Sequence, residues 1–476
     1  MNMDTLRDAT EYALKTAEKN TSQCEVFASA NSVRTIRFAL NNVLESKSIT
    51  DSGIGVRVVV DGSMGFSSTT LLEKDAIEET VLRAVKIARN KKPDTSFKSL
   101  PSPKGITRLS TPSDARLKEI DVEEIIKLGS APLEAGLKKE PSLEFSGSTN
   151  FVFEECVIMN SLGVDCEDSS SFIYAHVTAE GREGNSEFSG IGWNVARTIE
   201  GFSPDKAGEE AVENALKSKG GKTIKPGRYE TVFGHYAVAD LMEHVLSYAV
   251  SLGSVDAGIS YFTGGLGSQV AAEELSVFDD GTIEGALASK QVDDEGTPTR
   301  RTQVIRNGVL ENFLSDSYYA NKASKPEKLF ESTGNGFRFA GTPGRRYDSA
   351  PGIFPTNFGI EPGKRKAEEL VSEVKNGVYV GRLWYTYPIN HIQGDFTCTN
   401  RSNTYLIEDG EITQGIAANS FRINDNLPRL LQKIKGIGKE TKTVVVWGGA
   451  SAIIVPEVHF SDVNVIYAKN EEGHVH

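Results

Sequence analysis

The sequence is poor in cysteine and has no long apolar run, and both absences argue against whole classes of protein. Its 476 residues include four cysteines, none in a CxxC pair: Cys24, Cys156, Cys166 and Cys398. Such a scatter is typical of reduced thiols and disfavours a disulfide framework or a zinc knuckle. No stretch approaches the ~20 apolar residues of a membrane span, and charged residues interrupt the first twenty positions, where a secretory signal needs an apolar core. We therefore expect a cytoplasmic protein.

Positive charge is in deficit as well. Lys and Arg total 52 against 65 for Asp and Glu, which gives a net charge of −13. Such a field repels phosphate backbones, so we expect no unaided binding to nucleic acid.

Motifs of nucleotide, serine-hydrolase and zinc-helix chemistry are missing too, since the sequence has no Walker loop, no GxSxG and no HExxH. A metal site would have to draw on seven histidines: His176, His235, His244, His391, His459, His474 and His476. His235 and His244 would lie on opposite faces of one helix, because residues in a helix advance by ~100° each. Asp240 and His244 share a face, either as a weak metal pair or, more simply, as an i,i+4 contact.

Glycine, in contrast, is plentiful, and several of the 45 glycines follow Asp or Asn in pairs typical of hairpin turns. These pairs are Asp61-Gly62, Asp280-Gly281, Asn307-Gly308 and Asp409-Gly410. Apolar spacing predicts helices near the N-terminus and over 75–90, 122–137, 206–217 and 236–251.

The predicted fold class is α+β, with N-terminal helix-plus-antiparallel-sheet units followed by a mainly antiparallel β domain with a few helices. A Pro- and Ser-rich linker over 96–113 suggests three domains, at 1–105, 106–225 and 226–476. The second repeats the plan of the first, and whether this is an internal duplication stays open.

Five ordered stretches resemble the TldD/TldE (PmbA) metallopeptidase family, whose members have been labelled modulators of DNA gyrase. They are Gly53–Thr69, Asp293–Pro298, Ile305–Leu310, Ser332–Gly336, and Gly394–Phe396 followed by Tyr405–Gly410. Together they span most of the chain, and Gly53–Thr69 is fairly specific by itself.

The resemblance implies that a TldD-type catalytic subunit binds zinc through an HExxxH helix and a distant cysteine. In the matching stretch of this sequence, Glu243 and Tyr248 stand at the two histidine positions and His244 stands at the glutamate position. The stretch Val444–Ser451, which resembles the one that supplies the cysteine, contains none. The chain thus looks like the TldE/PmbA-type subunit, without catalytic residues or a cofactor of its own, with zinc expected on a TldD-type partner.

The resemblance further implies short or unfolded peptides as substrates, held in a cavity that this subunit helps to shape. We expect Tyr385, Tyr387, Asn390, His391 and Asp395 near that cavity, because polar and aromatic residues gather there; the alternative is that they are ordinary loop and core residues. Two other functions stay open: an autonomous hydrolase with a rearranged metal site around Glu243, His244 and His391, and a protein-binding modulator. The sequence also leaves open whether two copies of this chain pair when the partner is absent.

Overall fold

The computed structural model describes residues 2–106, 109, 113–184, 186–325, 329–339, 344–446 and 451–468. Its first half begins with helix α1 (Met3–Glu18), capped by the Asn2 side chain, which accepts a hydrogen bond from the Thr5 amide. Strands β1 (Gln23–Ala39), β2 (Asn42–Val60) and β3 (Ser63–Thr69) and helix α2 (Lys74–Arg89) follow. The predicted turn between β2 and β3 is confirmed, since Asp61 and Gly62 both have positive φ.

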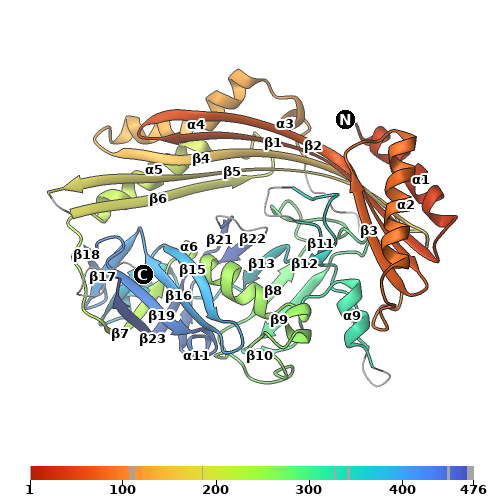
Figure 1. The fold of residues 1–476 in the computed structure, drawn as a ribbon. Coiled ribbons are helices and arrows are strands. Elements are labelled where there is room, and N and C mark those ends of the chain that lie inside the picture. Colours follow the sequence, from red (N-terminus) through yellow and green to blue (C-terminus); the bar gives the residue numbers. More distant parts are fainter. Residues whose placement is uncertain are drawn as a thin grey trace.

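The next segment repeats this plan of helix, three strands and helix. It comprises α3 (Arg116–Glu119), α4 (Val122–Lys139), β4 (Glu144–Asn160), β5 (Asp165–Glu183), β6 (Ser186–Ala196) and α5 (Pro204–Lys217). The six strands form one antiparallel sheet in the order β3-β2-β1-β4-β5-β6, so the two halves meet at β1 and β4 (Figure 1). The repeated plan inferred from the sequence is therefore present in the structure.

Glycines in the outermost strands let the last helix of each half lie close to the sheet. A Cβ on Gly65 of β3 would lie 2.0 Å from the Ala84 carbonyl of α2, and one on Gly192 of β6 would lie 2.1 Å from the Ala207 carbonyl of α5. Both helices, with α1 and α4, cover the same face of the sheet, here called its outer face.

In the part of the C-terminal half that the structure describes, two large sheets surround a short bent helix, and a small two-stranded sheet accompanies them. Its elements are β7 (Gly227–Phe233), α6 (His235–Leu241), η1 (Met242–Leu246), α7 (Ser247–Ala249), α8 (Leu252–Asp256), β8 (Val277–Asp280), β9 (Arg301–Arg306), β10 (Val309–Leu310), α9 (Ser317–Ala323), β11 (Gly336–Phe337), β12 (Gly352–Ile353), β13 (Asn357–Ile360), α10 (Ala367–Ser372), β14 (Asn376–Val380), β15 (Leu383–Asn390), β16 (Asp395–Asn400), β17 (Thr404–Glu408), β18 (Glu411–Gly415), β19 (Phe421–Asn426), α11 (Leu427–Leu431), β20 (Ile434–Ile437), β21 (Lys442–Val444), β22 (Ala452–Val455) and β23 (Val458–Tyr467). The α+β expectation, with a mainly antiparallel C-terminal region, is confirmed.

One C-terminal sheet runs β15-β16-β19-β23-β7-β14-β17-β18, with β20 beside β23, and the other runs β10-β9-β8-β13-β22-β21. The predicted turns at Asn307-Gly308 and Asp409-Gly410 are confirmed, because all four residues have positive φ. The prediction of a hairpin turn at Asp280-Gly281 is wrong. Strand β8 ends at Asp280, but its antiparallel neighbour β9 begins only at Arg301, after a long connecting segment.

Buried charges join the six-stranded sheet to the C-terminal half. Arg338 pairs with Glu25 of β1, and Arg57 of β2 pairs with both Glu25 and Glu295. A second group centres on Arg345, which lies 3.0 Å from Asp294 and also pairs with Asp168 of β5. The inner face of the sheet is thus docked on the C-terminal half through buried charges as well as a small apolar cluster that includes Val292 and Tyr347, whereas its outer face packs on helices through apolar contacts.

No helix in the described ranges is long and apolar enough to cross a membrane. The domain boundaries at 105 and 225 stay predictions; the structure adds that residues on both sides of the first boundary contribute strands to one sheet.

Candidate functional site

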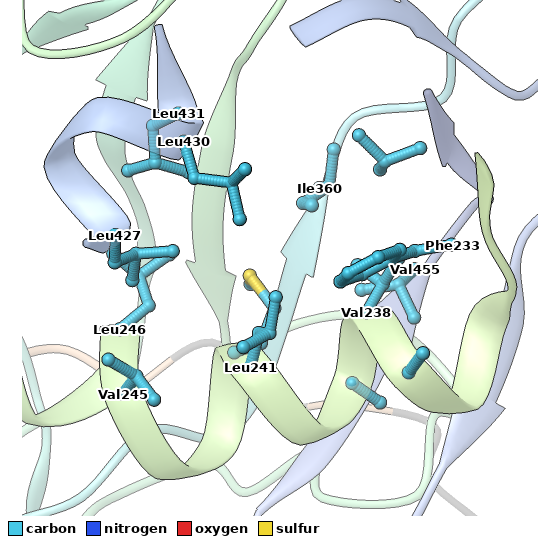
Figure 2. Packing of buried hydrophobic residues seen from close by; sticks show 14 of the residues in the cluster. Phe233, Val238, Leu241, Val245, Leu246, Ile360, Leu427, Leu430, Leu431 and Val455 are labelled. Atoms are coloured by element: carbon cyan, nitrogen blue, oxygen red, sulfur yellow. The ribbon is translucent and has the colours of Figure 1, made fainter. Parts of the chain in front are cut away.

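The stretch that resembles the zinc helix lies at the centre of the C-terminal half. Helix α6 begins at His235, one residue before the predicted start at 236, and one turn widens into the π-helical segment η1 before the chain returns to α-helix at Ser247. Figure 2 shows Val238, Leu241, Val245 and Leu246 directed into the apolar core between the two sheets. This apolar face fixes the orientation of the helix, and π-helical turns often occur at functional sites.

A cavity of about 30 Å³ lies between the apolar face of the helix and the core, and its walls include Leu241, Met242 and Ile360. None of the candidate site residues lines this cavity. It is a packing gap in the core and not the substrate cavity that the sequence led us to expect.

Glu243, at the first histidine position of the motif, is tied to a strand far along the chain. The Ser451 hydroxyl, directly before β22, donates a hydrogen bond to the Glu243 carboxylate. The Glu243 carbonyl oxygen accepts a second bond, from the Ser247 hydroxyl at 2.5 Å. Residues 447–450, the rest of the stretch where a cysteine was sought, lie outside the described residues.

His244, at the position of the catalytic glutamate, faces Asp240 one turn earlier. Its Nε2 lies 3.8 Å from Asp240 Oδ1, so the simple i,i+4 contact expected from the spacing is present. Burial lowers the pKa of His244, and burial raises the pKa of Asp240 to about 8, although the Arg382 guanidinium opposes that shift. At neutral pH both groups are therefore mainly neutral, and the contact is not an ion pair.

Tyr248, at the second histidine position, is held at both ends of its side chain. Its hydroxyl donates a hydrogen bond of 2.5 Å to the Ile259 carbonyl, and its ring packs on the His391 imidazole with 4.5 Å between centroids. Burial raises the pKa of the phenol, which keeps it protonated. His391 is an exposed residue in the turn between β15 and β16.

These three side chains do not fit a zinc site. Glu243 and Tyr248 stand at the two positions where the motif has zinc-binding histidines. The polar ends of both side chains already have protein partners. Within the described ranges, no three His, Cys, Asp or Glu side chains gather as ligands of a metal ion.

The five residues expected near the substrate cavity lie along β15 and the turn that follows it. Tyr385 and Tyr387 are 71% and 49% exposed, and β15 is the edge strand of its sheet. Tyr385 has a φ of 51°, in the left-handed region that bulky side chains rarely adopt. Of the five, His391 lies in ring contact with a motif position, Tyr248.

Asn390 and Asp395 have structural roles at the two ends of the same turn. The Asn390 side-chain oxygen accepts bonds from the amides of Ile392 and Gln393, and Asp395 accepts one from the Asn426 side chain at 2.9 Å. For these two residues the contacts favour the reading that they are ordinary loop residues.

Sequence reasoning missed the bond between Ser451 and Glu243. It also missed an arginine stack beside the helix, in which the guanidinium groups of Arg382 and Arg401 lie 5.1 and 4.9 Å from the Trp384 ring centroid. The Ser451–Glu243 bond joins residues 208 positions apart, and the stack brings Arg401 to a ring seventeen positions earlier, so local spacing does not report either arrangement.

Comparison with known proteins identifies the class to which this fold and site belong. Models of the PmbA/TldA metallopeptidase family match three successive regions: domain 1 over residues 24–88, the central domain over 115–219 and the C-terminal domain over 226–467. The chain belongs to the PmbA/TldD metallopeptidase family.

Its relatives extend over nearly the whole chain. A metalloprotease of Methanothermobacter thermautotrophicus is 25% identical over 468 residues, 96% of each chain, and PmbA of Escherichia coli O157:H7 is 23% identical over 95% of each. TldE from Thermococcus kodakarensis, 24% identical, has the same fold, with a TM-score of 0.85 over 96% of this chain and all of that one. A Thermotoga maritima protein labelled a modulator of a DNA gyrase is 26% identical, with a TM-score of 0.82 over 96% of this chain and 99% of that one.

Proposed function

We propose that this chain is the TldE/PmbA-type subunit of a cytoplasmic two-chain zinc metallopeptidase, which shapes the substrate cavity and leaves zinc chemistry to a TldD-type partner. The observation that carries the proposal is the state of the three motif positions. Glu243 is bonded by Ser451, His244 is neutral beside Asp240, and Tyr248 is held by Ile259 and His391. The polar ends of Glu243 and Tyr248 already have protein partners, and His244 by itself cannot supply both a zinc ligand set and the base that activates water.

Short or unfolded peptides are the substrates that the edge strand β15 suits best. An extended peptide can add its backbone to an exposed strand edge, which gives affinity with little side-chain selectivity. The outward-facing rings of Tyr385 and Tyr387 offer apolar surface beside that edge, next to the Tyr248–His391 contact. The net charge of −13 argues against nucleic acid as the ligand.

The test is to measure zinc content and cleavage of an unfolded peptide by the purified chain, alone and mixed with a TldD-type subunit from the same organism. We expect cleavage in the mixture alone, with one zinc ion per TldD-type subunit and none on this chain. Stoichiometric zinc and cleavage by this chain by itself would overturn the proposal in favour of an autonomous hydrolase.

A variant sharpens this test. If His244 has no part in catalysis, His244→Gln should leave cleavage by the mixture within about twofold of the unmodified pair, whereas loss of a general base costs ~100-fold or more. Replacing the glutamate of the partner's HExxxH helix by glutamine is the positive control for that loss.

A further inference from the structure

Arg382, directly before β15, is a buried cation without a carboxylate partner. The residue is 8% exposed, and its guanidinium lies 5.5 Å from the Tyr236 ring centroid and 5.1 Å from that of Trp384. Within the described ranges it forms no ion pair, and its one hydrogen bond runs to the Thr178 hydroxyl at 3.3 Å, while Nε has no partner. Most of the five N–H donors of this guanidinium therefore lack an acceptor in the described part of the chain.

Two other buried arginines show how such a charge is matched elsewhere in the molecule. Arg338 pairs with Glu25, and Arg345 pairs with three carboxylates. Burial of a guanidinium without a counter-charge is unfavourable, and burial accordingly lowers the pKa of Arg382. Asp240, on the neighbouring helix, is mainly neutral at pH 7 and does not supply the missing charge.

Two further arginines lie on the same face of the C-terminal sheet. The register pairs Trp384 with Thr399 and Thr399 with Arg422, and cross-strand partners share a face. The Arg401 guanidinium lies 4.9 Å from the Trp384 ring centroid, and its backbone amide donates a hydrogen bond to the Arg382 carbonyl. We call Arg382, Trp384, Arg401 and Arg422 the arginine face. A chain of net charge −13 thus gathers three cations on one sheet face.

Opposite the arginine face, the inner face of the six-stranded sheet supplies too little negative charge. Strand β5 contributes Glu180, which pairs with Arg401 at 2.6 Å, and Thr178, which accepts the bond from Arg382. Figure 1 shows β5 passing over β15 and β16, so the arginine face lies between the two sheets. Arg422 forms no ion pair within the described ranges, and its side chain donates to a threonine hydroxyl. Two of the three arginines therefore keep an unmatched positive charge.

We propose that the arginine face binds a carboxylate group of the peptide substrate, with Arg382 as the main donor. A guanidinium presents parallel N–H groups that match the two oxygens of a carboxylate, and such a pair is stronger in a site of low dielectric constant. The rings of Trp384 and Tyr236 offer aromatic surface beside the bound group. That the carboxylate belongs to a peptide rests on the proposed function, whereas the unmatched charge does not.

The arginine face can be reached from the surface and adjoins the edge strand to which we assign peptide binding. The side chains of Arg401 and Glu180 are 21% and 37% exposed, and Trp384 is the second residue of β15. A peptide that pairs with β15 in antiparallel direction has its C-terminal end at the first residues of this strand, which follow Arg382 directly. We therefore expect the C-terminal carboxylate as the ligand, and an Asp or Glu side chain shares the same chemistry.

The first test compares three synthetic peptides by isothermal titration calorimetry with the full chain alone. All are unstructured and N-acetylated: one has a C-terminal carboxylate and no acidic residue, one has a C-terminal amide instead, and one combines the amide with an internal Glu. We expect the free acid to bind about ten- to hundredfold more tightly than the neutral amide, because hydrogen bonds between charged groups are the strong ones. Tight binding of the Glu peptide would extend the site to acidic side chains, and weak binding would restrict it to C-termini.

The second test assigns the preference to Arg382. Arg382→Gln should make the free acid and the amide bind alike, and Arg382→Lys, which keeps the charge without the planar fork, should retain part of the preference. Arg306→Gln, at an exposed arginine that pairs with Glu311 in the other sheet, is the matched control and should leave the preference unchanged. The free acid should also raise the thermal unfolding temperature of the control but not that of Arg382→Gln.

Two results would overturn the inference: equal binding of the free acid and the neutral amide to the unmodified chain, or a preference that Arg382→Gln leaves intact. The first comparison needs no variant, so it stands even where a substitution prevents folding. Calorimetry uses neither zinc nor the partner. Equal binding would therefore remove the carboxylate site and leave the proposed subunit role in place, whereas a mixture without cleavage would remove the subunit role and leave the binding preference.

Discussion

The ring of Tyr248 lies against the imidazole of His391, with 4.5 Å between the ring centroids and 54° between the ring planes. This contact joins the end of the central bent helix to the turn after β15. The contact therefore links Tyr248, at the motif's second histidine position, to His391, which we expected near the substrate cavity. The ring that occupies the ligand position supports the turn beside the exposed edge strand.

The two parts of the Tyr248 interaction can be separated by substitution. Tyr248→Phe keeps the ring contact and loses the hydroxyl bond to Ile259, which should cost about 1 kcal/mol in the free energy of unfolding. Tyr248→Ala loses both and should cost roughly 2–4 kcal/mol. Urea unfolding measures the two values, and equal losses would show that the ring contact contributes nothing.

The Ser451–Glu243 bond has a matched control within the chain. Ser451→Ala should lower the free energy of unfolding by roughly 1.5–3 kcal/mol, because the hydroxyl bonds a carboxylate. Ser420→Ala removes a buried hydroxyl that has no hydrogen-bond partner among the described residues and should be close to neutral. If both serines behave alike in chemical denaturation, the Ser451 bond is too weak to position Glu243.

Asp240 should make stability depend on pH. Its pKa is about 8 in the folded protein and 3.8 in its ordinary state, and burial is the largest cause. Between these values the folded state holds a proton that the unfolded state has lost, so this group lowers stability as pH rises from about 4 to about 8.

Asp240→Asn should remove that contribution. Between pH 5 and pH 8 the free energy of unfolding should fall by roughly 2–4 kcal/mol more in the unmodified protein than in the variant. Denaturant midpoints at both pH values measure this difference. Burial lowers the pKa of His176 and His235 to about 4, and these groups act in the opposite direction below pH 6.5 in both proteins alike. Identical pH profiles would mean that the Asp240 carboxyl is ionised in the folded state.

Arg345 and its neighbour Arg346 should differ sharply when replaced. Arg345 is fully buried among Glu154, Asp168 and Asp294, so Arg345→Met would leave buried carboxylates without a counter-charge and cost about 3–5 kcal/mol. Arg346 is more exposed and pairs with Asp51 and Asp348 nearer the surface, so Arg346→Met should cost about 1 kcal/mol or less. Thermal unfolding of the two variants makes the comparison, and similar losses would contradict it.

Features encoded within a few residues could be predicted from the sequence. The turns at Asn307-Gly308 and Asp409-Gly410 need positive φ at both positions, and the helix over the motif follows from its apolar spacing. Asp280-Gly281 has the same local signal but forms no hairpin, because β8 pairs with a strand that begins twenty-one residues after Asp280, at Arg301. The contacts of Tyr248 with His391 and of Ser451 with Glu243 join distant segments, so no local pattern reports them. The repeated helix–strand plan was visible, but its joining into one sheet at β1 and β4 was not.

The buried charges between the sheet and the C-terminal half bear on how the chain is made. Glu154 and Asp168 belong to strands that leave the ribosome first, while their partners Lys290 and Arg345 follow much later. Until those cations emerge, burying the carboxylates would cost several kcal/mol each, so the inner face of the sheet must stay hydrated. Synthesis of residues 290–345 then permits the C-terminal half to dock on the inner face of the sheet. In a nascent chain stopped before Lys290, this inner face should be exposed to water.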